Sequence, residues 1–473
     1  MILRTRRTIA LGTLLLLLAG VLAACGSTAP SGGTGTGATA APSGGTAAGA
    51  TAAPAAAPTA APVTVNQGGG TKMRIWLFKS FVNAANDLLV QQVQDWAKSK
   101  NVEVELSFST FADQRQKFVT AIEGNDTPDV GEVDPTGPIR YSSSLLDVSD
   151  LAKEIADKNG GMLANVEPYV KLGDKYYGVP RYGLQSVLYI RKDLMDAKGL
   201  KPPTNWDELK DFASKIQDPS KEVYGFGQTL NKSTDGTVFA NVMLWDFGGG
   251  IFDAQGNAAF KSDANKQALQ YMTDLVGKAG IEPPGVNGWT DSSNNEAYLA
   301  GKLASTLNGA SLYYAMTTSK DQKVRDTIAK NTILLPWPAG PKGAFTVSNP
   351  NNWIIFKNTK NADLAKDLIR YLEDDKQFSA YLKASVGQAA PVYNNRFNDP
   401  FWKTDSNFEA ILTVMKNARA LGYPGPVTKA VVEVEGRYLL CDTASQIVSG
   451  GATVDQALDD AAAKVEDIVS STK

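Results

Sequence analysis

The feature that most constrains the fold is a regular exchange of strand-like and helix-like patterns across residues 73–133. Residues 73–78 and 102–108 alternate apolar with polar side chains, as half-buried strands do. A helical pattern lies between them, and a second one ends at Gly124, which we expect to be a left-handed helix cap. The short apolar stretch 128–133 completes a βαβαβ unit. This order predicts an α/β fold with a parallel sheet and helices on both faces.

Composition removes several classes of chemistry. The 473 residues include no histidine, which excludes Ser-His-Asp and Cys-His hydrolases, His-ligated zinc and an imidazole base. Lys and Arg number 47 against 49 Asp and Glu, so the basic excess that a nucleic-acid surface needs is absent. We expect no metal, no cofactor and no catalytic residue. Carboxylate-pair chemistry stays open because it needs only Asp and Glu.

The first 25 residues are organised like an export signal. Arg4, Arg6 and Arg7 precede an apolar stretch at 9–24, which is shorter than the roughly 20 residues that span a bilayer as a helix. The segment Leu-Ala-Ala-Cys-Gly around Cys25 resembles the lipobox of bacterial lipoproteins, in which the cysteine is lipidated after cleavage. A plain signal peptide with a chance cysteine is the other interpretation.

Residues 26–71 contain no charged and no aromatic side chain and consist almost entirely of Ala, Gly, Ser, Thr and Pro. Such a segment cannot bury enough apolar surface to offset its chain entropy. It is predicted to be a flexible tether with a root-mean-square span of roughly 35–40 Å. Lipid on Cys25 would then hold a folded body, beginning near residue 72, close to a membrane.

A set of short motifs follows in a fixed order. They are Pro-Asp-Val at 128–130, Tyr-Tyr-Gly-Val-Pro at 176–180, Leu-Tyr-Ile-Arg-Lys-Asp-Leu at 188–194, Gly-Leu-Lys-Pro-Pro-Thr-Asn-Trp-Asp-Glu-Leu at 199–209 and Val-Asp-Gln-Ala-Leu at 454–458. Together they resemble the extracellular solute-binding proteins of ABC importers, in the large family that takes up sugars. Ile190 and Arg191 replace the aromatic residue and the Asn that this family usually has there.

The resemblance implies a periplasmic-binding-protein-like fold with two α/β lobes, a hinge and a ligand cleft between the lobes. The lobes are discontinuous in sequence. Carried over to this chain, lobe 1 comprises residues 72–182 and 347–395, and lobe 2 comprises residues 183–346 and 396–473. The crossovers of the hinge are expected near 181–182, 347–348 and 395.

Ligand sites in open α/β sheets lie beyond the carboxyl ends of strands. Applied to the predicted strands, loops and hinge, this rule selects candidates whose aromatic faces and hydrogen-bonding groups suit a sugar ring. The predicted ligand-binding residues are Trp76, Lys79, Asp134, Arg181, Tyr182, Trp245, Asp246, Trp289, Ser311, Tyr313, Asn352 and Trp353. Each has a competing interpretation as a packing or capping residue.

The resemblance implies a monomeric, lipid-anchored extracytoplasmic subunit that captures a sugar or oligosaccharide by hinge closure and delivers it to the permease subunits of an ABC importer. Two alternatives remain. The same fold could bind a polyamine, a glycerophosphodiester or a peptide. A secreted glycosidase would need two carboxylates roughly 5–10 Å apart in one cleft.

Overall fold

The structure is a computed structural model that describes residues 61–472. The predicted signal peptide, Cys25 and residues 26–60 of the predicted tether lie outside the described residues. Within the described part of the chain, no helix is both long and apolar enough to cross a membrane.

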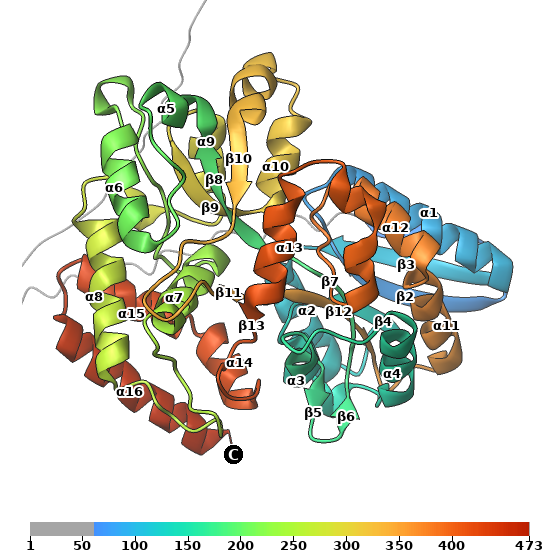
Figure 1. The fold of residues 1–473 in the computed structure, drawn as a ribbon. Coiled ribbons are helices and arrows are strands. Elements are labelled where there is room, and N and C mark those ends of the chain that lie inside the picture. Colours follow the sequence, from blue (N-terminus) through green and yellow to red (C-terminus); the bar gives the residue numbers. More distant parts are fainter. Residues whose placement is uncertain (1–60, 473) are drawn as a thin grey trace, which may run out of the picture. The chain divides into compact units, whose positions relative to one another are not determined.

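The larger sheet has the strand order β1-β3-β2-β4-β12-β7 (Figure 1). Its parallel centre comprises β2 (Thr71–Phe78), β3 (Val102–Ser109) and β4 (Val130–Val133). The helices α1 (Asn83–Lys100) and α2 (Phe111–Glu123) connect these strands, which confirms the predicted βαβαβ unit. The antiparallel strands β12 (Pro350–Ile355) and β7 (Val179–Gly183) extend the sheet. A late segment of the chain therefore completes a sheet that an early segment begins.

Alternation along β2 places its neighbouring side chains on opposite faces of this sheet. Ile75 and Leu77 pack into the core that contains the apolar side of α1, whereas Trp76 packs against Phe118 of α2. The other helices of this part of the chain are α3 (Gly137–Arg140), α4 (Ser149–Lys158), α11 (Ala362–Leu372) and α12 (Asp375–Ala384). Both α11 and α12 contact α1. Helices thus cover both faces, as predicted. We call this part lobe 1.

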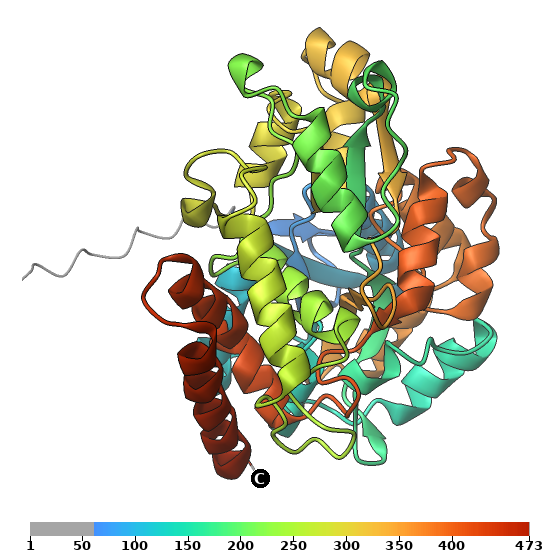
Figure 2. The ribbon, with the colours of Figure 1, turned by 60° about the vertical axis from the view of Figure 1, so that its left-hand side comes forward.

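The smaller sheet has the order β10-β8-β9, and its strands are antiparallel. The strands are β8 (Ser186–Arg191), β9 (Ser305–Gly309) and β10 (Thr332–Leu335). The helices around it are α5 (Lys192–Ala197), α6 (Trp206–Ile216), α7 (Thr234–Asp246), α8 (Asp263–Gly277), α9 (Ser293–Leu299), α10 (Ala310–Thr317), α13 (Phe408–Asn417), α14 (Lys429–Gly436), α15 (Leu439–Val448) and α16 (Val454–Ser471). Figure 2 shows α16 lying along α8, which it contacts. We call this part lobe 2.

The two sheets are joined by short crossovers. Only Leu184 and Gln185 separate β7 of the larger sheet from β8 of the smaller one. The backbone N–H of Leu184 donates to the carbonyl of Asn349 at 2.9 Å, so this crossover lies beside a second one. There β11 (Thr346–Val347) pairs in parallel with β13 (Ala418–Arg419) and is followed by β12. The fold is therefore the two-lobed α/β fold that was predicted. The residue limits of the lobes stay a prediction.

The predicted tether extends too far toward the carboxyl end. Residues 63–65 form β1 (Val63–Val65), which pairs antiparallel with β3. Val65 is buried in the core, and the side chain of Asn66 donates to the carbonyl of Val102 at 2.8 Å. The surrounding small residues concealed this strand, because only one of its three side chains is buried. The ordered body begins before residue 72.

The carboxyl end of α2 differs from the expectation, and the start of α6 shows how a side chain caps a helix. Gly124 has φ −79°, and the left-handed conformation falls one residue later, at Asn125 with φ 51°. Asn tolerates that region better than most residues other than Gly. Helix α6 is capped by Asn205, whose side chain accepts from the N–H of Glu208 at 2.8 Å. Thr204, the residue before this cap, donates its backbone N–H and its hydroxyl to the carboxylate of Glu208.

Candidate functional site

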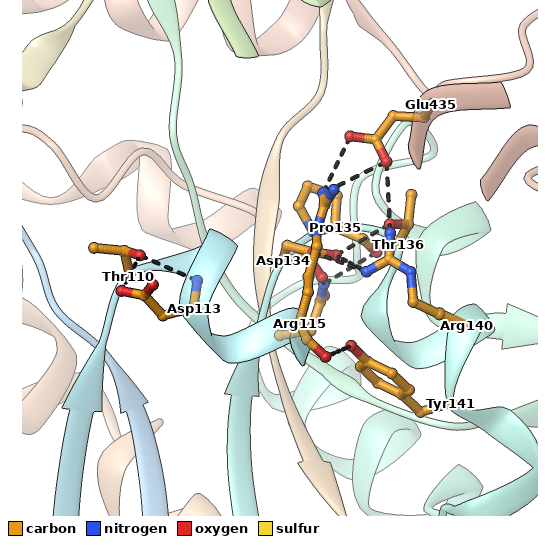
Figure 3. A network of polar contacts seen from close by, with 10 residues as sticks. Thr110, Asp113, Arg115, Asp134, Pro135, Thr136, Arg140, Tyr141 and Glu435 are labelled. Carbon is orange, nitrogen blue, oxygen red and sulfur yellow. Dashed lines mark hydrogen bonds and ion pairs between the residues drawn. The ribbon is translucent and has the colours of Figure 1, made fainter. Parts of the chain in front are cut away.

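Four charged side chains meet where the strand ends of lobe 1 face α14 of lobe 2 (Figure 3). Asp134 accepts from Nε of Arg115 at 2.6 Å and from Nη1 of Arg140 at 2.9 Å. Glu435 approaches the same two guanidinium groups from lobe 2, at 3.1 Å from Nη2 of Arg115 and 3.5 Å from Nη2 of Arg140. We call these residues the charged quartet. It joins the two lobes, and its formal charges cancel.

The fold holds the lobe 1 members of the quartet in place. Arg115 lies in the second turn of α2, Asp134 directly follows β4, and Arg140 ends α3. Thr136 donates to Asp134 at 3.0 Å and accepts from Nη2 of Arg140 at 2.6 Å. Burial alone would raise the pKa of Asp134, but the two guanidinium groups outweigh burial and hold its pKa well below the usual value. Asp134 therefore stays ionised.

The arginines of the quartet retain hydrogen-bonding capacity. The Arg115 side chain is 29% exposed, and its Nη1 has no hydrogen-bond partner among the residues that the structure describes. A guanidinium carries five N–H donors in a fixed plane, so donors remain available after both carboxylates are bound. The quartet can thus donate to a neutral oxygen without offering a net positive charge.

A second feature is a group of buried polar atoms without partners. Gln114, in the first turn of α2, and Gln185, in the crossover, are each 2% exposed, and neither amide has a partner for its oxygen or its nitrogen within the described chain. The hydroxyls of Ser109, Thr346 and Ser348 share this property. Leaving such a group unpaired costs about 1–3 kcal/mol, and native proteins rarely do so. These groups therefore have hydrogen-bonding capacity that no other described residue uses.

The loop after β2 presents an aromatic face. Phe81 is 74% exposed. Its neighbour Ser80 is buried, donates to the side chain of Gln388 at 2.6 Å, and bonds through its backbone to the side chain of Asn86. This anchoring leaves Phe81 directed outward next to Lys79, which is also exposed. Phe81 was not among the predicted residues, although it follows a strand end and the same rule could have selected it.

Most of the predicted ligand-binding residues are buried in this structure. The buried ones are Trp76, Asp134, Arg181, Tyr182, Trp245, Asp246, Tyr313, Asn352 and Trp353. Lys79 is exposed, and Trp289 and Ser311 are half-buried. Ser311 and the crossover residue Gln185 are both neighbours of Gly309. A Cβ placed on Gly309 would lie 3.6 Å from Oγ of Ser311 and 3.8 Å from the carbonyl oxygen of Gln185.

Three of the buried residues form part of one cluster in lobe 1. Arg181 donates to Glu132 at 2.7 Å, and the hydroxyl of Tyr182 donates to the same carboxylate oxygen at 3.1 Å. The guanidinium carbon of Arg181 lies 4.6 Å from the ring centroid of Trp353 and 4.1 Å from that of Tyr381. Burial alone would lower the pKa of Arg181, but Glu132 and its other neighbours raise it above the usual value. This cluster stabilises the start of the crossover, and ligand contact by its members stays a prediction.

The other buried candidates also have protein partners. Trp76 lies under Nζ of Lys117, 3.8 Å from the ring centroid, and the side chain of Asn352 donates to the carbonyl of Pro350 at 3.0 Å. In lobe 2, the ring of Trp245 meets that of Tyr423 edge-on.

Two further lobe 2 candidates bind protein groups directly. Tyr313 donates to Asp405. The carboxylate of Asp246 accepts from Nε1 of Trp206 at 2.6 Å and from the N–H of Phe345 at 3.1 Å. Burial raises the pKa of Asp246 to about 7. Asp246 thus connects α7 to the segment that leads into β11.

The half-buried Trp289 contributes through its backbone, since its carbonyl accepts from the hydroxyl of Thr229 at 3.2 Å. Among residues 61–472, no group of three or more Cys, Asp or Glu side chains is arranged to hold a metal ion.

Two α/β lobes joined by short crossovers, with polar and charged groups where the lobes meet, are the arrangement that the sequence resemblance implied. The family model described as bacterial extracellular solute-binding protein matches residues 79–377. This match covers more than half of the chain, so the protein belongs to that family.

Known proteins with similar chains and folds agree with this assignment. The arabinooligosaccharide-binding protein of Bacillus subtilis is 21% identical over 434 residues, which cover 87% of this chain and 95% of that protein. A solute-binding protein of Thermotoga lettingae bound with α-D-tagatose superposes with a TM-score of 0.73 at 20% identity, and covers 84% of this chain and 100% of that one. The maltose-bound MalE3 of T. maritima has the same TM-score at 21% identity, with the same coverage. At these identities the structural matches establish the fold.

Proposed function

We propose that this protein is the extracytoplasmic solute-binding subunit of an ABC importer, and that it captures a neutral sugar or oligosaccharide between its lobes. The observation that carries the proposal is the charged quartet, which brings groups from both lobes together at the strand ends without a net charge. Family membership supports transport as the role, and relatives named for arabinooligosaccharides support the ligand class.

The side chains at the interlobe edge suit a ligand rich in hydroxyls. A hydroxyl both donates and accepts, so it can bond to a guanidinium, a carboxylate or a primary amide. The quartet supplies the first two, and Gln114 and Gln185 supply amides without protein partners. Phe81 offers an apolar face of the kind that packs against the C–H surface of a sugar ring.

The cancelled charge argues against the charged alternatives. A polyamine would be bound by an excess of carboxylates, and a glycerophosphodiester by an excess of Arg or Lys or by a helix N-terminus. Two arginines and two carboxylates offer neither excess. A peptide remains less favoured because its termini also carry charges.

The glycosidase alternative finds little support at this site. A general acid needs a raised pKa, whereas the pKa of Asp134 is held well below its usual value. Asp134 and Glu435 also bind the same two arginines rather than facing each other across open space. The family and its structural neighbours are binding proteins, so we propose that this chain has no catalytic residue.

Closure of the lobes is the mechanism we propose for capture. The two-residue link between β7 and β8 is short enough to act as a hinge. Glu435 can reach the arginines only when lobe 2 lies against lobe 1. A ligand that bridges the lobes would shift the population toward this arrangement, which the permease subunits would recognise. Lipid on Cys25 would keep the monomeric protein at the outer face of the membrane.

Differential scanning fluorimetry on the chain from Gly26 onward would test this function. The panel should contain neutral mono- and oligosaccharides, polyamines, glycerophosphodiesters and short peptides. A ligand at a hundred times its Kd adds about 2.7 kcal/mol to the free energy of unfolding. We expect stabilisation by one class of neutral sugar without product formation. Stabilisation by a charged ligand alone would refute the sugar assignment.

A matched pair of variants would locate the ligand. Arg115→Met should weaken the identified sugar by at least tenfold, because both lobes are bridged through this side chain. Arg370→Met is the control, since Arg370 forms an exposed pair with Glu154 away from the quartet. If Arg115→Met and Arg370→Met bind the sugar with equal affinity, the quartet is not part of the ligand site.

A further inference from the structure

Glu435 differs from the other members of the charged quartet in its origin. It comes from α14 of lobe 2, 320 residues after Arg115, whereas Asp134 lies 19 residues from Arg115 and 6 from Arg140. The lobe 1 members of the quartet are therefore two arginines and one carboxylate, and their formal charges sum to one positive unit. Glu435 cancels that charge only when the lobes are together.

The two carboxylates are also held differently. Asp134 lies 2.6 and 2.9 Å from the guanidinium nitrogens, and its side chain is 6% exposed. Glu435 lies at 3.1 and 3.5 Å, and its side chain is 16% exposed. In Figure 3 Glu435 approaches from above, and Arg115, Asp134 and Arg140 lie below it. The longer contacts show that Glu435 is held less closely by the arginines than Asp134 is.

Two guanidinium groups that share one carboxylate can recognise a further carboxylate, unless a side chain of the protein already occupies that position. We propose that Glu435 is a specificity-determining residue that makes the interlobe site reject anionic sugars, such as uronates, while neutral sugars are accepted. The inference rests on the proposed function, because it places the ligand at the quartet. A uronate carboxylate near the arginines must either displace Glu435 or lie beside it as a like charge. Both outcomes oppose binding, so rejection comes from repulsion rather than from a missing contact.

Replacement of Glu435 by glutamine isolates this effect. The amide keeps the shape of the side chain and an oxygen that accepts from Arg115, but it leaves the arginine pair with a net positive charge. Glu433→Gln is a matched control on the same helix. It makes the same change in total charge, but Glu433 is 45% exposed and pairs with Arg437 at 2.7 Å. Glu435→Ala is a second variant that removes the carboxylate without relying on the amide.

Isothermal titration of glucuronate and galacturonate, with glucose and galactose as neutral counterparts, would test the inference at 20 and 200 mM NaCl. Each protein is first checked for cooperative thermal unfolding. We expect Glu435→Gln to bind at least one uronate tenfold or more tightly than Glu433→Gln does, with a smaller gain at the higher salt concentration because screening weakens the attraction.

Equal uronate affinities in the Glu435→Gln and Glu433→Gln proteins would overturn the inference. So would a wild-type protein that binds uronates as tightly as Glu435→Gln does. The uronate comparison does not need the natural ligand, so it is separable from the proposed function. A wild-type protein that binds none of the neutral mono- and oligosaccharides of the fluorimetry panel, together with a uronate gain in Glu435→Gln, would refute the proposed sugar ligand and leave the charge role of Glu435 supported.

Discussion

Arg181→Met should lower the free energy of unfolding by about 3–5 kcal/mol, because it leaves Glu132 as a buried charge without a cation. Arg181 and Glu132 have 3% and 0% of their side-chain surface exposed, and their atoms lie 2.7 Å apart. The hydroxyl of Tyr182 at 3.1 Å and the amide of Asn351 at 3.2 Å would still donate to Glu132. These donors are neutral and cannot replace the lost charge. Methionine roughly preserves the volume, so the effect of a cavity stays small.

This loss of stability can be measured by equilibrium unfolding in urea, followed by tryptophan fluorescence and circular dichroism. It should appear as a lower urea concentration at the unfolding midpoint, with an unchanged dependence of the free energy on urea concentration. Arg370→Met serves as the control and should cost less than about 1 kcal/mol, since its pair with Glu154 is exposed. The double variant Arg181→Met/Glu132→Gln should have a free energy of unfolding about 2 kcal/mol higher than Arg181→Met, because it no longer contains the unpaired buried carboxylate. A loss below about 1 kcal/mol in Arg181→Met, or losses that simply add in the double variant, would refute this reasoning.

Three further predictions follow from single side chains. Burial raises the pKa of Asp246 from 3.8 to about 7, although hydrogen bonds from Trp206 and Phe345 oppose that rise. The carboxyl of Asp246 therefore loses its proton near pH 4 in the unfolded chain and near pH 7 in the folded chain. The contribution of Asp246 to the free energy of unfolding should therefore fall by up to about 1.4 kcal/mol per pH unit across that window, and Asp246→Asn should reduce the slope of stability against pH in thermal unfolding from pH 4.5 to 7.5, while Asp235, whose pKa burial also raises to about 7, maintains part of it. Phe81→Ala should leave the unfolding midpoint unchanged, because this ring is 74% exposed, and should weaken the sugar about three- to tenfold in isothermal titration; an unchanged Kd would place it outside the site. Gln185→Leu removes two unpartnered buried atoms, so stability should be equal or higher while affinity falls at least tenfold; lower stability with unchanged affinity would contradict this assignment.

Local patterns predicted the parts of the fold that depend on neighbours in the chain. The alternation in residues 73–78 and 102–108 corresponds to strands β2 and β3, and the order of motifs identified the family. The same reasoning failed where one buried contact decides the outcome. Val65 is a single apolar anchor in a stretch of small residues, and its burial against the large sheet ends the tether earlier than composition indicated.

The candidate site was less accessible to sequence reasoning. The strand-end rule selected Asp134, which the structure places in the quartet, and the same rule could have selected Phe81. It could not indicate which aromatic and charged residues turn inward. Arg181 and Trp353 were selected because a charged group and an aromatic ring suit a sugar ligand. In the structure they interact within lobe 1 instead: Arg181 pairs with the carboxylate of Glu132 and packs over the ring of Trp353.

From the sequence alone one can predict the family, the βαβαβ order within residues 73–133 and the side-chain types at the ends of those strands. Which of these side chains meet depends on tertiary packing. Arg115 contacts Glu435, which lies 320 residues later in the chain, and the hydrophobic pattern of neither segment predicts that contact. Periodicity reports which face of one element is buried, whereas the partner of a buried or charged group depends on how distant elements pack. In this protein that packing is set by the crossovers between the two sheets, which bring α14 of lobe 2 to the arginines of lobe 1.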